Sequence, residues 1–118
     1  MVEVLYKNAI SNDVDIARCD NYTYFGNIRL GSYYSSTYKE DKRIVNPKEE
    51  KKYVFEELPN VWNKLIRKDL FDDIRFREHL KWEDGPVIRP ITAKANKVVY
   101  LYDKMYMYRT NLNNTTIK

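Results

Sequence analysis

The chain has 118 residues, 43% of them hydrophobic and 32% charged, which indicates one compact globular domain and excludes a disordered chain. No run of about 18 apolar residues occurs, so the sequence predicts no membrane-spanning helix. The formal net charge of +4 suits anionic partners such as nucleotide diphosphates, phospholipid headgroups or nucleic acid, without choosing among them.

The first half of the chain is predicted to form a helix followed by strands. Apolar residues recur at helical spacing in residues 2–12. Strands are predicted for residues 15–25, 28–30 and 33–38, which are rich in tyrosine and β-branched residues, and a charged loop for residues 39–43. Cys19 is the single cysteine, and its place in a strand predicts a buried, inert thiol in a reducing, cytoplasmic setting.

The second half alternates short helices and strands. A helix is predicted for residues 47–58, an extended segment for 61–66, helical turns for 68–73 and a loop for 74–81. A weaker helix at 87–96 is expected to start effectively at Pro90, because a proline inside a helix removes a hydrogen bond. Strands at 98–102 and 105–108, joined by Asp103 and Lys104, precede a polar, flexible tail at 110–118.

The stretch from Val61 to Gly85 has a residue order that core packing alone does not require. It holds a tryptophan near each end, with Asn63 and Lys64 after the first and the acidic pair Glu83-Asp84 after the second. Asp84 precedes Gly85-Pro86, which is a good helix start, so Asp84 is also a candidate helix cap. A cap at a loop end exposes its carboxylate, so capping would leave Asp84 available for a functional role as well.

Short motifs in a fixed order carry a family resemblance. In the second half they are Asn63-Lys64-Leu65, Leu70-Phe71, Ile74-Arg75-Phe76, Glu83-Asp84, Ala95 with Lys97–Leu101, and Tyr106–Arg109; in the first half they are Val4-Leu5-Tyr6 and Val14–Ala17. In this order and spacing they resemble the C-terminal half of bacterial family 2 glycosyltransferases, which have the GT-A fold. The resemblance covers most of the chain.

The resemblance implies an α/β fold: a partial GT-A-like mixed sheet with flanking helices, without the N-terminal nucleotide-binding half. Residues 1–118 would be one acceptor-side segment, inactive alone, of an inverting enzyme that moves a sugar from a nucleotide-sugar donor to a saccharide or lipid-linked acceptor. The complete enzyme would use Mn²⁺ or Mg²⁺, held by an Asp-x-Asp motif that lies before this segment. Asp13-Val14-Asp15 matches that string but precedes a strand, so we interpret it as a turn and expect no metal here.

The resemblance also assigns site residues. Asp84 corresponds to the general base and Glu83 to a residue that orients it or contacts the acceptor. Asn63 and Lys64 correspond to the acceptor side, with a solvated turn as the alternative. Trp82, like Trp62, offers a ring for stacking on a sugar, with core packing as the alternative. Arg109 corresponds to a basic residue near the donor diphosphate, with a solvent-exposed strand end as the alternative.

Several features depart from the family or leave other functions open. Gly85-Pro86 and Pro90 replace bulkier, helix-forming residues, which implies a reshaped acceptor pocket. A non-catalytic interaction module and a small basic nucleic-acid-binding domain remain alternatives, although no known nucleic-acid-binding motif is present. Without its nucleotide-binding half, the chain is expected to form homo-oligomers through strand edges at 15–25 or 98–102 or through the helix at 2–12. Peripheral contact with the inner membrane face is a further expectation.

Overall fold

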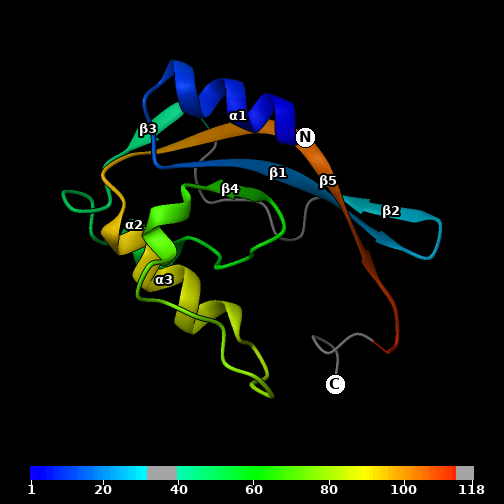
Figure 1. Cartoon of the computed structure of the whole chain (residues 1–118). Coiled ribbons are helices and arrows are strands. Elements are labelled where there is room, and N and C mark those ends of the chain that lie inside the picture. Colours follow the sequence, from blue (N-terminus) through cyan, green and yellow to red (C-terminus); the bar gives the residue numbers. More distant parts are fainter. Residues whose placement is uncertain (32–39, 114–118) are drawn as a thin grey trace.

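The computed structural model describes residues 1–31 and 40–113, which form a curled mixed sheet with helices on both faces (Figure 1). The strands are β1 (Ile16–Phe25), β2 (Ile28–Gly31), β3 (Arg43–Val45), β4 (Lys64–Ile66) and β5 (Val98–Thr110). The helices are α1 (Val2–Ser11), α2 (Tyr53–Glu56), the 3-10 helix η1 (Lys68–Phe71) and α3 (Asp84–Lys94). The predicted α/β class with a mixed sheet and flanking helices is confirmed. None of the helices in the described ranges is long and apolar enough to cross a membrane.

The sheet is organised around β1 and β5, which run parallel side by side. The strand order is β2-β1-β5-β3, and β4 pairs with the first residues of β1 on the side opposite β5. β1 is therefore flanked on both sides, and Val98–Tyr100 of β5 lie between β1 and β3. The two strands expected to provide open edges are thus partly covered: β1 is paired on both sides near its two ends, and β5 is paired on both sides at Val98–Tyr100. Association through a sheet edge stays a prediction.

Two apolar clusters lie on opposite faces of the sheet. Under α1 the cluster comprises Leu5, Val14, Ala17, Cys19, Val99 and Leu101. Under α2, α3 and η1 it comprises Ile16, Val45, Tyr53, Leu70, Val87, Ile88, Ile91, Ala95 and Val98. Neighbours such as Val98 and Val99 enter different clusters because successive side chains of a strand point to opposite faces. This double burial explains the apolar run that opens β5.

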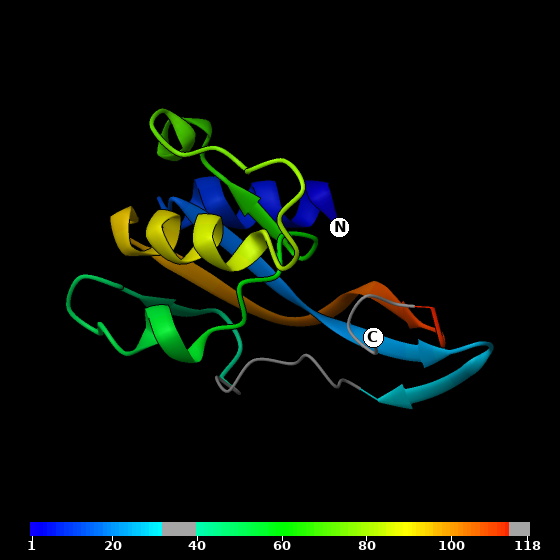
Figure 2. The same cartoon turned by 90° about the horizontal axis from the view of Figure 1, so that it is seen from below.

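The far halves of β1 and β5, together with β2, extend beyond the helices as an arm (Figures 1 and 2). The arm exposes four large apolar side chains, Phe25, Ile28, Leu30 and Met107. At its base the register shifts twice, since Arg18 pairs with Tyr100, Asp20 with Lys104 and Asn21 with Tyr106. These irregularities bend β5 and separate the arm from the helix-covered body of the sheet.

Two predicted helices have different bounds in the structure. The helix expected at 47–58 is reduced to Tyr53–Glu56, because Asn46 closes a preceding turn: its carbonyl accepts from Glu49 and Glu50, and its side chain accepts from Lys48. The helix expected at 87–96 begins at Asp84 and continues through Pro90. Pro90 lacks only the hydrogen bond to the carbonyl of Pro86, so a start at Pro90 was the wrong expectation.

Strand predictions were corrected at two places. Residues 98–102 and 105–108 belong to one continuous strand, β5, and Asp103-Lys104 lies at the register shift rather than in a turn. Arg43 opens the short strand β3, which was not predicted, instead of ending a loop. The helix at 2–12 and the strands at 15–25 and 28–30 were predicted correctly. The strand predicted at 33–38 lies outside the described residues.

Candidate functional site

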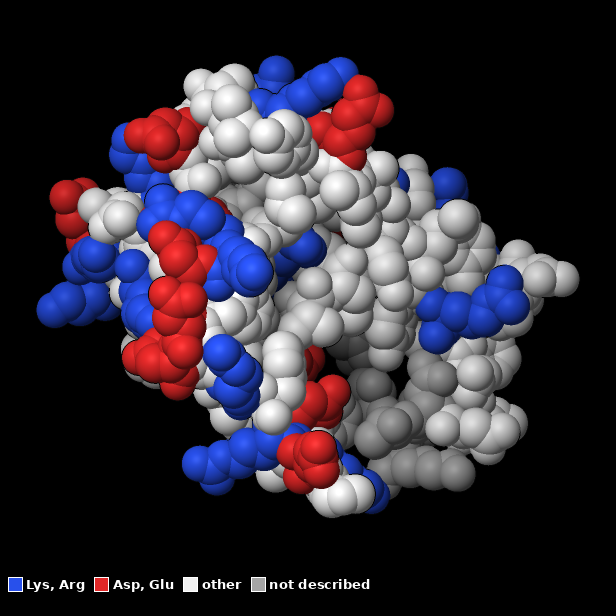
Figure 3. All heavy atoms as spheres, in the orientation of Figure 1, with Lys and Arg blue, Asp and Glu red and all other residues white. Residues whose placement is uncertain are grey.

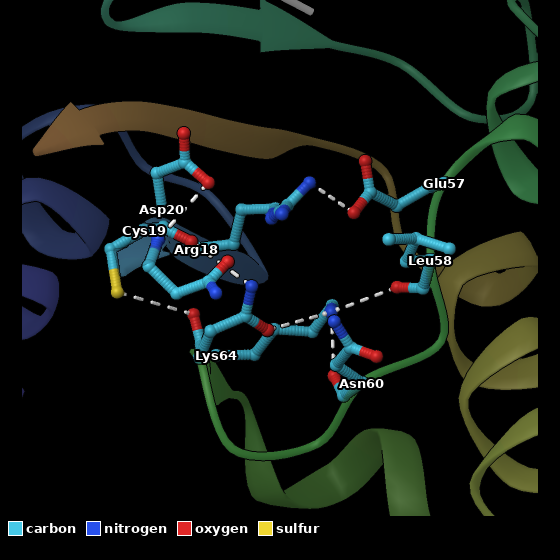
Figure 4. Close-up of polar contacts among 9 residues, drawn as sticks. Arg18, Cys19, Asp20, Glu57, Leu58, Asn60 and Lys64 are labelled. Carbon is cyan, nitrogen blue, oxygen red and sulfur yellow. Dashed lines mark hydrogen bonds and ion pairs between the residues drawn. The ribbon is translucent and has the colours of Figure 1, made fainter. Parts of the chain in front are cut away.

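A buried ion pair lies where β1 faces the segment that follows α2. Arg18 of β1 is fully buried, and its guanidinium pairs with the carboxylate of Glu57 (Figure 4). The same guanidinium lies 4.9 Å from the centre of the Tyr100 ring. A buried charge needs such a partner, because its desolvation is otherwise too costly. Burial also raises the pKa of the Tyr100 hydroxyl, which stays protonated at neutral pH. The pair therefore fixes the start of the loop that carries Asn63 and Lys64.

Lys64, the first residue of β4, holds three residues of that loop together through its side chain. Its Nζ donates to the carbonyl oxygens of Leu58 at 3.1 Å and Asn60 at 2.6 Å, and to Oδ1 of Asn63 at 3.0 Å (Figure 4). Three acceptors thus match the three N–H bonds of an ammonium group. Burial, followed by the charge of Arg18, lowers the pKa of Lys64 to about 7. Near neutral pH the ammonium and the neutral amine are therefore both populated.

Asn63 fastens the same loop to β1. Its Nδ2 donates to the carbonyl of Cys19 at 3.0 Å, and its own carbonyl accepts from the Cys19 N–H at 3.0 Å. Asn63 is buried, so its side chain lies in the interior rather than in the solvated turn considered as an alternative. The Cys19 thiol is also buried, as predicted, and burial raises its pKa, which disfavours the reactive thiolate.

The acidic pair lies at the start of α3. Glu83 is the N-cap residue and is exposed, while Asp84 is the first helical residue and is half-buried. Asp84 Oδ1 accepts from the N–H of Gly85 at 3.0 Å, and neither side chain makes a capping bond further along the helix. The charge of Asp84 acts on Lys64 and raises its pKa, against the larger effect of burial. Asp84 is thus one of the charges that act on Lys64, after burial, Arg18 and Glu57.

The two tryptophans have different environments. Trp82 is 56% exposed and has a backbone φ of 60°, a left-handed conformation that bulky residues rarely adopt. Trp62 is half-buried, and its ring stacks on Tyr106 at 4.5 Å and on Tyr108 at 5.2 Å between ring centroids. Trp62 therefore connects the Lys64 loop to the base of the arm, and Trp82 is the more accessible ring.

Arg109 lies near the far end of β5, on the arm. It is exposed, pairs in register with Tyr24, and lines a shallow pocket of about 380 Å³ with Tyr24, Gly26, Asn27 and Met107. Among the predicted site residues, Asn63 and Lys64 lie in one loop and Glu83 and Asp84 lie at the start of α3, and the charge of Asp84 acts on Lys64.

The Asp13-Val14-Asp15 string forms a turn and the entry to β1. Asp13 has a φ of 50°, and Asp15 is buried. The Asp15 carboxylate accepts from the Asn96 N–H at 2.6 Å and pairs with Arg67 at 2.7 Å. Over residues 1–31 and 40–113, no group of three His, Cys, Asp or Glu side chains is placed to hold a metal ion.

Sequence reasoning did not single out Arg18, Glu57 or the Trp62 ring stack as part of this site. A charged residue between the apolar Ala17 and Cys19 at the start of β1 was the available signal for Arg18, because a buried charge requires a counter-charge. Its partner Glu57 lies 39 residues away, and no local pattern identifies it.

No protein-family model matches the chain. It is similar to two proteins of Streptococcus pneumoniae serotype 4 (strain ATCC BAA-334 / TIGR4). It is 30% identical over 115 residues to the glycosyltransferase GlyA and 26% identical over 121 residues to the glycosyltransferase GlyG. Both alignments cover 92% of this chain, which spans only 16% of GlyA and 38% of GlyG. The chain is thus a distant relative of a limited segment of two proteins named glycosyltransferases.

Proposed function

We propose that this chain is the acceptor-side part of an inverting glycosyltransferase of family 2, with the GT-A fold. The observation that carries the proposal is the alignment of 92% of the chain with segments of two proteins named glycosyltransferases. The order of motifs through Glu83-Asp84 supports it independently. The substrates would be a nucleotide-sugar donor and a saccharide or lipid-linked acceptor.

Asp84 is the proposed general base. The acceptor hydroxyl oxygen attacks the anomeric carbon from the side opposite the leaving group, its proton passes to the Asp84 carboxylate, and the bond to the nucleoside diphosphate breaks. A new glycosidic bond forms with inverted configuration. A half-buried carboxylate at a helix start, with one oxygen bonded to Gly85, is held in a fixed orientation for this transfer. Glu83, exposed beside it, would contact the acceptor or orient the base.

The remaining residues of the proposed site supply binding and position. Lys64 and Asn63 would shape the acceptor side through the loop that they hold, and the exposed ring of Trp82 offers an apolar face to a sugar. Arg109 would meet donor phosphate oxygens through its guanidinium fork. A divalent cation, Mn²⁺ or Mg²⁺, and the nucleotide would be held mainly by parts of the enzyme beyond this segment.

The charges on one face of the molecule support this function over nucleic-acid binding through that face. On the face shown in Figure 3, lysines and arginines lie beside aspartates and glutamates instead of forming a basic stripe. A backbone-binding surface would concentrate positive charge along one path, because phosphates provide most of the affinity.

The test is Asp84→Asn in the complete enzyme that carries this segment. The amide keeps the shape but cannot take the proton, so the transfer rate should fall about 100-fold or more while donor binding is retained. Glu78→Gln, an exposed carboxylate of the neighbouring loop, is the matched control and should leave transfer unchanged. A rate within about threefold of the parent enzyme would remove Asp84 from the mechanism.

A further inference from the structure

We propose that Lys64 is a positioning residue whose ammonium group holds the Leu58–Asn63 loop closed, and that loss of one proton releases this loop and the Trp62 ring within it. This proposal rests on the proposed function in one respect: that function makes the loop part of the acceptor side. The contacts that carry it belong to the chain alone, and its test uses no sugar.

The geometry leaves each N–H of the ammonium with its own acceptor. Leu58 O, Asn60 O and Asn63 Oδ1 lie 3.1, 2.6 and 3.0 Å from Nζ. A neutral amine has two N–H bonds, so one of the three oxygens loses its donor on deprotonation. An acceptor left without a partner away from water is costly. The loop therefore has one arrangement that satisfies the charged form and a looser one that suits the neutral form.

Trp62 lies inside this loop, between two of the residues that Lys64 binds. Its ring stacks on Tyr106 and Tyr108, so any movement of the loop changes the contacts of the ring. On the other side of the loop, Asn63 is held to Cys19 by three hydrogen bonds that do not involve Lys64, one of them from the Cys19 thiol. Asn63 thus stays anchored, and the movement is confined to the residues before it.

Charged and titratable groups from each packed element act on Lys64. Arg18 and Cys19 come from β1, Glu57 follows α2, and Asp84 opens α3. Burial and Arg18 favour the neutral amine, whereas Glu57, Asp84 and Cys19 favour the ammonium, and the pKa comes to about 7. Lys64 therefore changes charge within the range where enzymes work, unlike an exposed lysine with a pKa of about 10.4.

The experiment is a pH titration followed by NMR on the isotope-labelled chain, from about pH 5.5 to 9. Trp82→Phe leaves Trp62 as the single tryptophan, and His79→Gln removes the single histidine. The side-chain carbon next to Nζ reports the charge of Lys64, and the Trp62 indole N–H reports the loop. Lys64→Met is the test variant, and Lys68→Met, an exposed lysine of η1, is its matched control.

We expect Lys64 to titrate with a midpoint of about 7 and the Trp62 signal to shift with the same midpoint. The shift should vanish in Lys64→Met and persist in Lys68→Met. A Lys64 midpoint near 10.4, or a Trp62 shift that survives in Lys64→Met, would overturn the proposal. If Lys64→Met does not fold, the agreement or disagreement of the two midpoints in the parent chain decides the question. None of these results depends on glycosyl transfer.

Discussion

At the scale of single residues, Arg18 and Glu57 hold the site through a contact that removes both charges from water. Such a pair is weak evidence of net stability, but breaking it leaves one buried charge without a partner. Two nitrogens of Arg18, Nε and Nη2, already have no hydrogen-bond partner among the described residues. Arg18 is therefore unusually dependent on its counter-charge.

Glu57→Gln should lower the free energy of unfolding by about 3 kcal/mol or more, because the amide cannot neutralise the buried guanidinium. Urea denaturation measures the loss. Glu56→Gln is the matched control, since Glu56 is the preceding residue and is exposed, and it should change stability by less than about 0.5 kcal/mol. A similar small effect for both variants would show that Glu57 does not compensate Arg18.

Lys64 should also make the free energy of unfolding depend on pH. Its pKa is about 7 in the folded chain and 10.5 as a free side chain, so between these values the unfolded chain binds more protons. The free energy of unfolding therefore rises as pH increases from about 7 toward 10.5. Lys64→Met should flatten this rise relative to Lys68→Met, measured by denaturation at pH values of about 7 and 9. An equal rise in both variants would contradict the assignment to Lys64.

At the scale of elements, local patterns predicted what local interactions decide. Helical spacing located α1, and stretches rich in tyrosine and β-branched residues located β1 and β2. The parallel pairing of β1 with β5 joins residue 16 to residue 98, and no local pattern encodes it. The same holds for the site: Asp84 and Lys64 stood out in the sequence, whereas the bonds of Asn63 to Cys19 span 44 residues.

Helix α3 shows how packing overrides a local preference. Pro90 lies inside the helix, yet Val87, Ile88 and Ile91 around it are buried in the core under the sheet. Burial of three such side chains contributes several kcal/mol, on the order of 1.5–3 kcal/mol each, and offsets a proline cost of about 3 kcal/mol. The helix therefore continues through the proline, and its start at Asp84 sets the position of the acidic pair.

Pro90→Ala should raise the free energy of unfolding by about 1–3 kcal/mol, since the new N–H can donate to the carbonyl of Pro86. Pro86→Ala is the matched control: Pro86 is also exposed, but it lies in the first turn, where an N–H has no helical acceptor. Thermal unfolding of both variants makes the comparison. If Pro90→Ala is no more stable than Pro86→Ala, the cost that we assign to Pro90 is absent.

At the scale of the whole molecule, the order of the strands points to a different surface for contact between two copies of the chain. Both ends of β1 and Val98–Tyr100 of β5 are flanked on both sides, so these segments do not offer open edges for another chain. Helix α1 instead presents Val2, Tyr6 and Ile10, which are 61%, 59% and 66% exposed. Residues four apart lie on one side of a helix, so the three form a continuous apolar stripe.

We therefore predict that the chain self-associates through α1. Tyr6→Ser with Ile10→Ser should convert the oligomer to a monomer at about tens of micromolar, because apolar burial supplies most of the association energy. Neither change alters the net charge of +4, whose repulsion is screened beyond about 8 Å at physiological salt. Ile28→Ser with Leu30→Ser on the arm is the matched control, since both side chains are equally exposed there. Sedimentation velocity distinguishes the states. A parent chain that sediments as a monomer and unfolds cooperatively would contradict the prediction, and it would favour the self-contained interaction module over a segment of an enzyme.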